Sequence, residues 1–259
     1  MSAPRFIACV PPGDTPVPAE VLKVAGEDRI IPVWVNGLGG LTFKLIGPRS
    51  VRFAKFSIRP EPGVDVAPLA LQEMQLNNEV QRLSWASNYT VVPKVLSCED
   101  FDAGQLMITT GLDGENLVSQ RGQRDPRRAS IALGAGLRQL HSRLPVAQCP
   151  FEWNIHSRIA VLPQALRAEF LAQAPEEDLV VCHSDACAPN TLIDKSFQVA
   201  GHVDLGMLGV GDRWADLSIA SLSTEWNFGP GFEQFVYEGY EIEPDEQKIN
   251  FYRRLWDAT

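Results

Sequence analysis

Long apolar runs are missing from this sequence of 259 residues. No stretch approaches the roughly 18 apolar residues that a bilayer-spanning helix needs, so we expect no membrane partner. The first residues, MSAPRFIACVPPGD, lack the basic start and apolar centre of a secretory signal. These absences predict a cytoplasmic protein.

Cysteine is scarce and basic side chains are outnumbered. The five cysteines are scattered, and no two form a C-x-x-C pair. Their odd number and spacing argue against a disulfide framework or a zinc site, so no disulfide partner is expected. Lys and Arg total 23 against 32 Asp and Glu, a net charge of −9. This balance disfavours nucleic acid and is compatible with a cationic partner.

The apolar residues that are present follow two different patterns along the chain. Up to residue 111 they form short β-like runs, at 29–35, 41–47, 50–58 and 105–110, with one helical pattern over 67–88. Later the pattern is mainly helical, at 128–144, 155–174, 213–226 and 245–257. The sequence predicts an α+β chain. A small β-rich lobe with one helix covers 1–111, and a larger, mainly helical lobe covers 112–259.

One stretch, VVCHSDACAPNTLIDK at 180–195, concentrates polar side chains between apolar runs. The run LVVCH reads as a buried strand that leads into a loop, and TLI reads as a hairpin strand returning from it. His183, Asp185 and Asn190 would therefore lie together at a turn. The run VAGHVDLG places Asp204 at the end of another apolar strand, so two carboxylates and an amide are expected to converge.

These side chains suit phosphoryl transfer. One carboxylate accepts the proton of the acceptor hydroxyl, while a second carboxylate and a carboxamide hold Mg²⁺ through oxygen. The alternative is a turn rich in Asp, Asn, Ser and Pro, which favour turns for local backbone reasons. The combination of H-S-D-x-x-x-x-N at 183–190 with V-D-L-G at 203–206 favours the catalytic interpretation.

The chain resembles the aminoglycoside phosphotransferases, whose loop usually reads H-G-D-x-x-x-x-N and whose metal motif reads I-D-x-G. The resemblance is greatest to the 3′ and 3″ subgroup and extends over segments NGLGGLTFKL, FAKF, NEVQRLSWAS, LRQLHS, VVCHSDACAPN, VDLGMLGVGDRWADL and FYRRLWD. It implies a bilobal, protein-kinase-like fold and ATP-dependent phosphorylation of an aminoglycoside hydroxyl, which gives antibiotic resistance. GTP is an alternative nucleotide. The other functions left open are a kinase of another small alcohol and an inactive nucleotide-binding homologue.

The resemblance assigns roles within the loop. Asp185 is the catalytic aspartate, His183 orients its loop, and Asn190 and Asp204 are Mg²⁺ ligands. Ser184 stands where the family usually has glycine. A glycine there would permit a positive φ, so serine implies either a backbone that ordinary residues tolerate or a local shift of Asp185.

The nucleotide site is expected in the first lobe. A glycine turn would cover the phosphates, Lys55 on the next strand would contact them, and Glu79 on the helix would pair with Lys55. Family analogy places adenine against backbone groups near Thr110 and Leu112. The glycines of the turn are Gly37, Gly39 and Gly40. Taken separately, the turn could be an ordinary hairpin and Lys55 an exposed strand lysine; their order along the chain favours the nucleotide site.

The remaining assignments concern support and substrate. Asp216 would lie in the first turn of a helix and brace the catalytic loop, while Asp212 would precede that helix and add negative charge to the substrate cleft. By resemblance, Arg213 contacts substrate or phosphate. The carboxylates of Asp257 and of the terminal residue Thr259 would bind amino groups of the antibiotic.

Overall fold

The computed structural model describes residues 9–60, 63–64 and 66–259. By its contacts the chain divides into two compact units. The first consists of the described part of Met1–Ser84 together with Pro93–Gly111, and the second of Trp85–Val92 with Leu112–Thr259. This division differs from the expected boundary in segment 85–92. That segment packs with the second unit because the Trp85 ring lies 6.2 Å from the Phe151 ring and Tyr89 Oη donates to Gln148 Oε1.

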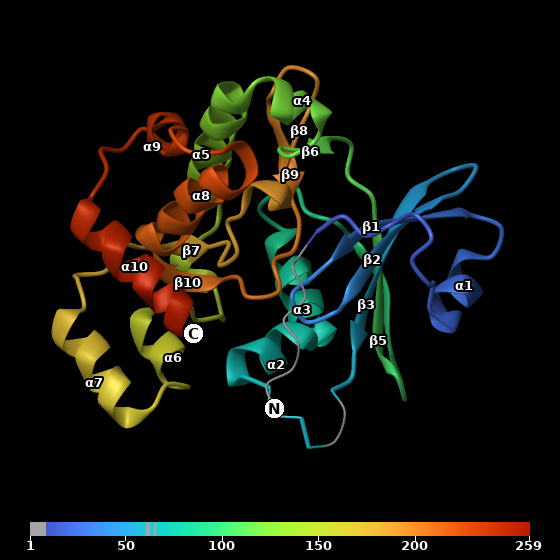
Figure 1. Ribbon diagram of the computed structural model, residues 1–259, viewed down its shortest axis with the longest axis horizontal. Helices are drawn as coiled ribbons and strands as arrows, with labels where there is room; N and C mark the ends of the chain where they lie inside the picture. The colour runs from blue at the N-terminus through green and yellow to red at the C-terminus, as the bar shows by residue number, and fades with distance from the viewer. Residues whose placement is uncertain (1–8, 61–62, 65) are drawn as a thin grey trace. The chain divides into compact units, whose positions relative to one another are not determined.

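The first unit is built on an antiparallel sheet in the order β1-β2-β3-β5-β4 (Figure 1). Its strands are β1 (Arg29–Val35), β2 (Leu41–Ile46), β3 (Val51–Ile58), β4 (Val95–Phe101) and β5 (Gly104–Thr110). The sequence predicted four of these strands. Strand β4 was missed because it is an edge strand whose sequence, VLSCEDF, does not alternate between apolar and polar residues.

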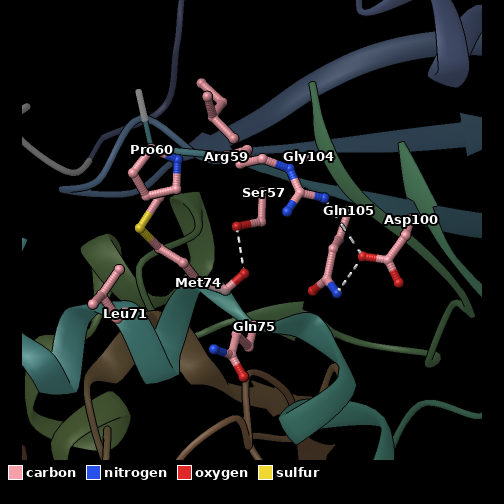
Figure 2. Close-up of a pocket in the computed structure, with 10 residues that line it drawn as sticks. Ser57, Arg59, Pro60, Leu71, Met74, Gln75, Asp100, Gly104 and Gln105 are labelled. Atoms are coloured by element: carbon pink, nitrogen blue, oxygen red, sulfur yellow. Dashed lines mark hydrogen bonds and ion pairs between the residues drawn. The ribbon is translucent and has the colours of Figure 1, made fainter. Parts of the chain in front are cut away.

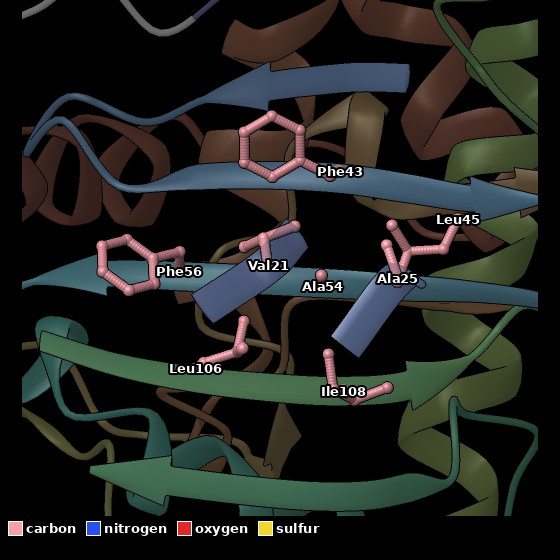
Figure 3. Close-up of a cluster of buried hydrophobic side chains, with 8 residues drawn as sticks. All are labelled: Val21, Ala25, Phe43, Leu45, Ala54, Phe56, Leu106 and Ile108. Atoms are coloured by element: carbon pink, nitrogen blue, oxygen red, sulfur yellow. The ribbon is translucent and has the colours of Figure 1, made fainter. Parts of the chain in front are cut away.

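One face of this sheet is covered by helix α1 (Ala19–Ala25). Alternate residues of the central strands point to this face, as the strand period of two requires. Figure 3 shows the resulting core, made by Val21, Ala25, Phe43, Leu45, Ala54, Phe56, Leu106 and Ile108. Because Ala54 and Phe56 point into this core, Lys55 between them must point to the opposite face.

The first unit has more helices than the sequence indicated. The single helix expected over 67–88 is wrong: it is two helices, α2 (Pro68–Met74) and α3 (Leu76–Ala86), separated by Gln75 in an extended conformation. Two side chains from the sheet fix this break. Ser57 Oγ donates to Met74 O at 2.6 Å, and Leu76 N donates to Gln105 Oε1 at 2.7 Å. With α1, the described part of this unit therefore contains three helices.

The second unit is mainly helical. Its longer helices are α5 (Pro126–Arg143), α7 (Gln164–Gln173), α8 (Arg213–Phe228), α9 (Glu233–Tyr240) and α10 (Glu246–Ala258). The helix expected over 155–174 is interrupted, because α6 (Ile155–Ile159) ends before Pro163, which begins α7. Short helix α4 (Gln120–Arg124) precedes α5.

Helices α5 and α9 pack unusually closely. A Cβ atom added at Gly134 of α5 would come within 1.9 Å of Val236 O, and one added at Gly239 of α9 within 2.0 Å of Ile131 O. Only glycine fits at these two contacts. The close approach brings the ends of both helices together, so Tyr240 of α9 reaches His141 of α5.

Two small sheets complete this unit. Strand β7 (Leu179–Cys182) pairs with β10 (Gly209–Asp212), and β8 (Thr191–Ile193) lies between β6 (Glu115–Asn116) and β9 (Val199–His202). The expected hairpin between LVVCH and TLI is therefore wrong. The 3₁₀ turn Ala188–Asn190, which contains Pro189, redirects the chain from one sheet to the other.

Two absences can be compared with the structure. None of the helices in the described ranges combines the length and the apolar character needed to span a bilayer. All five cysteines lie within those ranges and are free.

Candidate active site

The loop between β7 and the 3₁₀ turn Ala188–Asn190 carries the expected catalytic residues. His183 is fully buried, and its Nε2 lies 3.0 Å from Val203 O. Asp185 N donates to His183 Nδ1 at 3.3 Å. A carbonyl can only accept, so the imidazole proton is on Nε2 and Nδ1 is the acceptor. The ring therefore links the backbone of Asp185 to the residue that precedes Asp204.

The backbone of this loop is held by the carboxylate of Asp216, which lies in the first turn of α8. Asp216 Oδ2 accepts His183 N at 2.6 Å, and Oδ1 accepts Ser184 N at 2.8 Å. The side chain is buried, which by itself would raise its pKa. The hydrogen bond from His141, with the backbone amides of the loop, outweighs burial and lowers the pKa of Asp216. Asp216 thus stays ionised and holds two consecutive amides of the loop, the geometry that the bracing role requires.

Asn190 orients the carboxylate of Asp185. Its Nδ2 donates to Asp185 Oδ2 at 2.8 Å and to Asp185 O at 3.0 Å. Burial and the negative charge of Asp204 raise the pKa of Asp185, whereas hydrogen bonds from Cys187 and Asn190 oppose this shift. Asp204 is thus close enough for the two carboxylates to interact.

These oxygens fit a hard divalent cation. The amide nitrogen of Asn190 points to Asp185, which leaves Asn190 Oδ1 as a ligand, and Val203 N donates to Asn190 O at 3.0 Å, next to Asp204. Within the described residues no group of three His, Cys, Asp or Glu side chains could hold a metal. Mg²⁺ is usually held by one or two carboxylates and completes its shell with phosphates and water.

Ser184 adopts the backbone that glycine would favour. Its φ is +75°, in the left-handed region, and its buried hydroxyl has no hydrogen-bond partner among the described residues. The alternative of a displaced Asp185 is not needed, because Asp185 keeps its bonds to Asn190 and His183. The serine therefore costs free energy without distorting the loop, about 1–2 kcal/mol for the left-handed backbone alone.

In the first unit, Lys55 and Glu79 are brought together. Lys55 Nζ lies 2.7 Å from Glu79 Oε2, and only 19% and 6% of the two side chains are exposed. Glu79 lies one turn into α3, whose first residue is capped by Gln105. Figure 2 shows Ser57 and Gln105 at this junction, where a cavity of about 250 Å³ lies. Ser57 and Gln105 thus tie the start of the helix that carries Glu79 to the sheet that carries Lys55.

Backbone amides of the glycine turn donate hydrogen bonds to Asn36, the residue that precedes the turn. Asn36 Oδ1 accepts Leu38 N at 3.1 Å and Gly40 N at 2.7 Å, and Asn36 O accepts Gly39 N. Gly39 has φ +82°, which ordinary residues disfavour, and a Cβ at Gly40 would crowd Asn36. Gly37 lies between these residues. In the turn that was expected to cover the phosphates, the amides of Gly39 and Gly40 are therefore bonded to Asn36.

Thr110 and Leu112, the residues expected near adenine, differ in the hydrogen bonds that their backbone amides make. Thr110 N donates to Lys94 O at 2.9 Å, so this amide is already used. Leu112 makes no backbone hydrogen bond among the described residues. Of the two amides, that of Leu112 is the one left for a ligand.

The three residues expected to bind substrate differ in their contacts within the protein. Arg213 pairs with Asp178, Nε to Oδ2 at 2.7 Å, and donates to Tyr240 Oη at 3.2 Å. Asp257 is exposed near the end of α10 and makes no polar contact among the described residues. Thr259 Oγ1 accepts from the buried Arg158 at 3.1 Å.

The expectation that Asp212 adds charge to a substrate cleft is wrong. Asp212 is fully buried and caps α8 by accepting Trp214 N at 2.8 Å. Its other oxygen pairs with Lys248 Nζ at 2.7 Å. A buried carboxylate that is neutralised in this way stabilises the start of α8 and presents no charge to a ligand.

Sequence reasoning missed two residues behind the loop, His141 and Tyr240. His141 Nε2 lies 2.9 Å from Asp216 Oδ2, and its Nδ1 lies 2.8 Å from Tyr240 Oη. His141 occurs in the segment LRQLHS, but no role was assigned to it. The only signal in the sequence was that His141 lies on the apolar face of a helix. Many histidines in protein cores have this position, so it does not indicate a function.

Replacing Ser184 with glycine should stabilise the protein. Ser184→Gly relieves the left-handed strain and removes the unpartnered hydroxyl, whose burial costs about 1–3 kcal/mol; the extra freedom of an unfolded glycine offsets about 0.5–1 kcal/mol. Ser184→Ala is the matched control, since it removes the hydroxyl and keeps the strain. Denaturant unfolding should rank the glycine variant above the alanine variant by about 1 kcal/mol. Equal or reversed stabilities would show that the backbone at this position is not strained.

Comparison with known proteins agrees with this arrangement. A model of the phosphotransferase enzyme family matches residues 64–252. A streptomycin 3″-kinase from Streptomyces griseus is 30% identical over 96% of this chain and 98% of its own. An aminoglycoside 3′-phosphotransferase from Streptomyces fradiae is 29% identical over 76% of this chain and 85% of its own.

Solved structures give the same result. Aminoglycoside phosphotransferase APH(3″)-Id from Streptomyces rimosus has a TM-score of 0.67 at 26% identity, over 92% of this chain and 95% of that one. The same protein has been solved with ADP and streptomycin, with a TM-score of 0.64 over 92% of this chain and 96% of that one. The bilobal, protein-kinase-like α+β fold is thereby confirmed, and the chain belongs to the phosphotransferase enzyme family.

Proposed function

We propose that this protein transfers the γ-phosphoryl group of ATP to a 3′ or 3″ hydroxyl of an aminoglycoside and thereby confers antibiotic resistance. The observation that carries the proposal is the loop in which Asn190 orients the Asp185 carboxylate and Asp216 holds the two preceding amides. The relatives of the chain by sequence are kinases of this class. The cytoplasm, where ATP is available, is the proposed location.

Asp185 is the proposed base. Its carboxylate accepts the proton of the acceptor hydroxyl and holds that oxygen in line with the phosphoryl group. His183 supports this role because its Nδ1 accepts a hydrogen bond from the backbone amide of Asp185. The fixed hydrogen bond from Asn190 leaves Asp185 Oδ1 as the oxygen that faces the hydroxyl.

Asn190 and Asp204 are the proposed Mg²⁺ ligands, through Asn190 Oδ1 and the Asp204 carboxylate. Bound Mg²⁺ would neutralise negative charge on the phosphates of the nucleotide. It would also relieve the repulsion between Asp185 and Asp204, which the raised pKa of Asp185 reflects.

The first unit is the proposed nucleotide-binding lobe, residues 1–111, and the second the catalytic lobe, residues 112–259. The ion pair to Glu79 directs Lys55 to the α- and β-phosphates. The turn of Gly37, Gly39 and Gly40 covers the phosphates once its amides exchange Asn36 for phosphate oxygens. Backbone groups near Thr110 and Leu112 bind adenine, with GTP as the alternative nucleotide.

The acceptor is a cation, which suits carboxylates at its binding site. Asp257 and the terminal carboxylate of Thr259 are the proposed partners of its amino groups. Arg213 was expected at substrate or phosphate, but its bonds to Asp178 and Tyr240 favour a role within the protein. Macrolide 2′-phosphotransferase and choline kinase structures share the fold at 13–14% identity, so a kinase of another small alcohol is the alternative.

Asp185→Asn should remove activity while preserving the fold. The amide retains an oxygen that accepts from Asn190 but is not a base, so kcat should fall by about 10²- to 10⁴-fold. Asp194→Asn is the control, because Asp194 is an exposed turn residue whose Oδ1 only accepts Ser196 N and Gln198 N, as an amide also can. Steady-state turnover with an aminoglycoside measures the effect. An Asp185→Asn enzyme with more than a tenth of wild-type kcat would exclude Asp185 as the base.

Asp204→Asn should raise the Mg²⁺ concentration needed for activity. A neutral amide is a weaker ligand for a hard cation than a carboxylate. The backbone tolerates the change, since Asp204 has φ +62° and asparagine readily adopts this conformation. Turnover measured across a Mg²⁺ titration should show a shifted midpoint for Asp204→Asn and none for Asp194→Asn. If the two midpoints agree, Asp204 is not a metal ligand.

A further inference from the structure

A continuous line of hydrogen bonds runs from the first residue of α8 to the catalytic loop. Arg213 Nη1 donates to Tyr240 Oη at 3.2 Å, and Tyr240 Oη lies 2.8 Å from His141 Nδ1. His141 Nε2 lies 2.9 Å from Asp216 Oδ2, and Asp216 accepts the amides of His183 and Ser184. Three helices, α5, α8 and α9, each contribute to this line.

Every donor in the line points toward Asp216. The carboxylate can only accept, so His141 donates from Nε2, and the neutral imidazole then accepts at Nδ1. Tyr240 then donates its proton to His141 and accepts from Arg213. Burial raises the pKa of Tyr240 to about 12, so its hydroxyl retains the proton that it donates. A chain of aligned donors is mutually polarised, which strengthens each bond.

We infer that Tyr240 and His141 are positioning residues of the catalytic loop, with Arg213 as the outer end of the same line. They fix the position and charge of the Asp216 carboxylate, which in turn sets the backbone that presents Asp185. They touch neither substrate nor nucleotide in this role. The inference rests on the proposed function only because phosphoryl transfer serves as one of its readouts.

Arg213 is suited to the outer end of the line. About a quarter of its side chain is exposed, and its guanidinium is held on the surface by Asp178. A surface ion pair of this kind contributes little by itself. The second contact, to the buried Tyr240 hydroxyl, is the one that couples Arg213 to the interior. The guanidinium of Arg213 is thus bound by two residues of the protein itself, Asp178 and Tyr240.

The alternative is that these residues only stabilise the packing of α5 against α9. Helix α9 provides a matched control for this. Tyr237, one turn before Tyr240, is equally buried and donates its hydroxyl to Ser221 Oγ at 2.8 Å, outside the line. Tyr237→Phe and Tyr240→Phe each remove one buried hydroxyl from the same helix and keep the ring. Only Tyr240→Phe breaks the line.

The kinetic test compares these two variants. Tyr240→Phe should lower kcat by about 3- to 30-fold, the range for residues coupled to a site at a distance, with KM for ATP and for the aminoglycoside changed less than about twofold. Tyr237→Phe should retain kcat within about twofold and lose a similar amount of thermal stability. An unchanged kcat for Tyr240→Phe, or an equal loss for Tyr237→Phe, would overturn the inference.

A double-mutant cycle tests the place of Arg213. If Arg213 acts through Tyr240, Arg213→Gln should lower kcat in the wild type and have little further effect in Tyr240→Phe. Equal losses in both backgrounds would mean that Arg213 acts directly on substrate or phosphate. No loss in the wild type would remove Arg213 from the line. Either of these results overturns its role as the outer end.

Imidazole ¹⁵N spectra test the line without any turnover, which separates this inference from the proposed function. The chain has four histidines, so each signal can be assigned by substitution. In the wild type, His141 should show the Nε2–H tautomer with a hydrogen-bonded Nδ1. In Tyr240→Phe, the Nδ1 signal should move toward that of a nitrogen with no donor, and the His183 signals should shift as well. A His183 spectrum identical to wild type would overturn the inference, even if the enzyme phosphorylates no aminoglycoside.

Discussion

The two hydrogen bonds from the backbone of His183 and Ser184 to the Asp216 carboxylate hold the catalytic loop in place. An ionised carboxylate buried without partners would cost several kcal/mol, so Asp216 requires all of its donors. Two of them are consecutive amides of the loop, and the chain turns through the left-handed backbone of Ser184 directly after them. The residue after this turn is Asp185. The bonds to Asp216 therefore fix the position from which the strained residue directs the chain to Asp185.

Buried carboxylates organise the chemistry in other parts of the chain as well. Glu79 holds Lys55 in the first unit, and Asp212 holds both the start of α8 and Lys248 in the second. Each has a cation or several amides as partners, and each fixes a segment that carries functional residues. Asp185 and Asp204 differ, because burial and the negative charge of Asp204 raise the pKa of Asp185. That difference separates the supporting carboxylates from those proposed to meet Mg²⁺ and the acceptor hydroxyl.

Features that depend on residues close together in the sequence were predicted, whereas features that depend on contacts between distant residues were not. The strands at 29–35 and 51–58 were predicted because alternation of apolar residues is local. The spacing of one short motif was enough to predict that Asp185 and Asn190 lie together. The pairing of β7 with β10 was not predicted, since it depends on a partner nearly thirty residues away. The break at Gln75 was missed for the same reason, because Ser57 and Gln105 cause it from the sheet. Asp212 was misjudged because its partner, Lys248, lies on another helix. The bond from Arg213 to Tyr240 was not predicted for the same reason.

The central claim is that this loop catalyses transfer of one phosphoryl group from ATP to an aminoglycoside. The most direct measurement is to incubate the protein with ATP, Mg²⁺ and a panel of aminoglycosides, and to identify the products by mass spectrometry and ³¹P NMR. The account predicts equal amounts of ADP and of an aminoglycoside that carries one phosphate on a 3′ or 3″ oxygen. ADP formation that is independent of the aminoglycoside, with no phosphorylated product from any member of the panel, would contradict it.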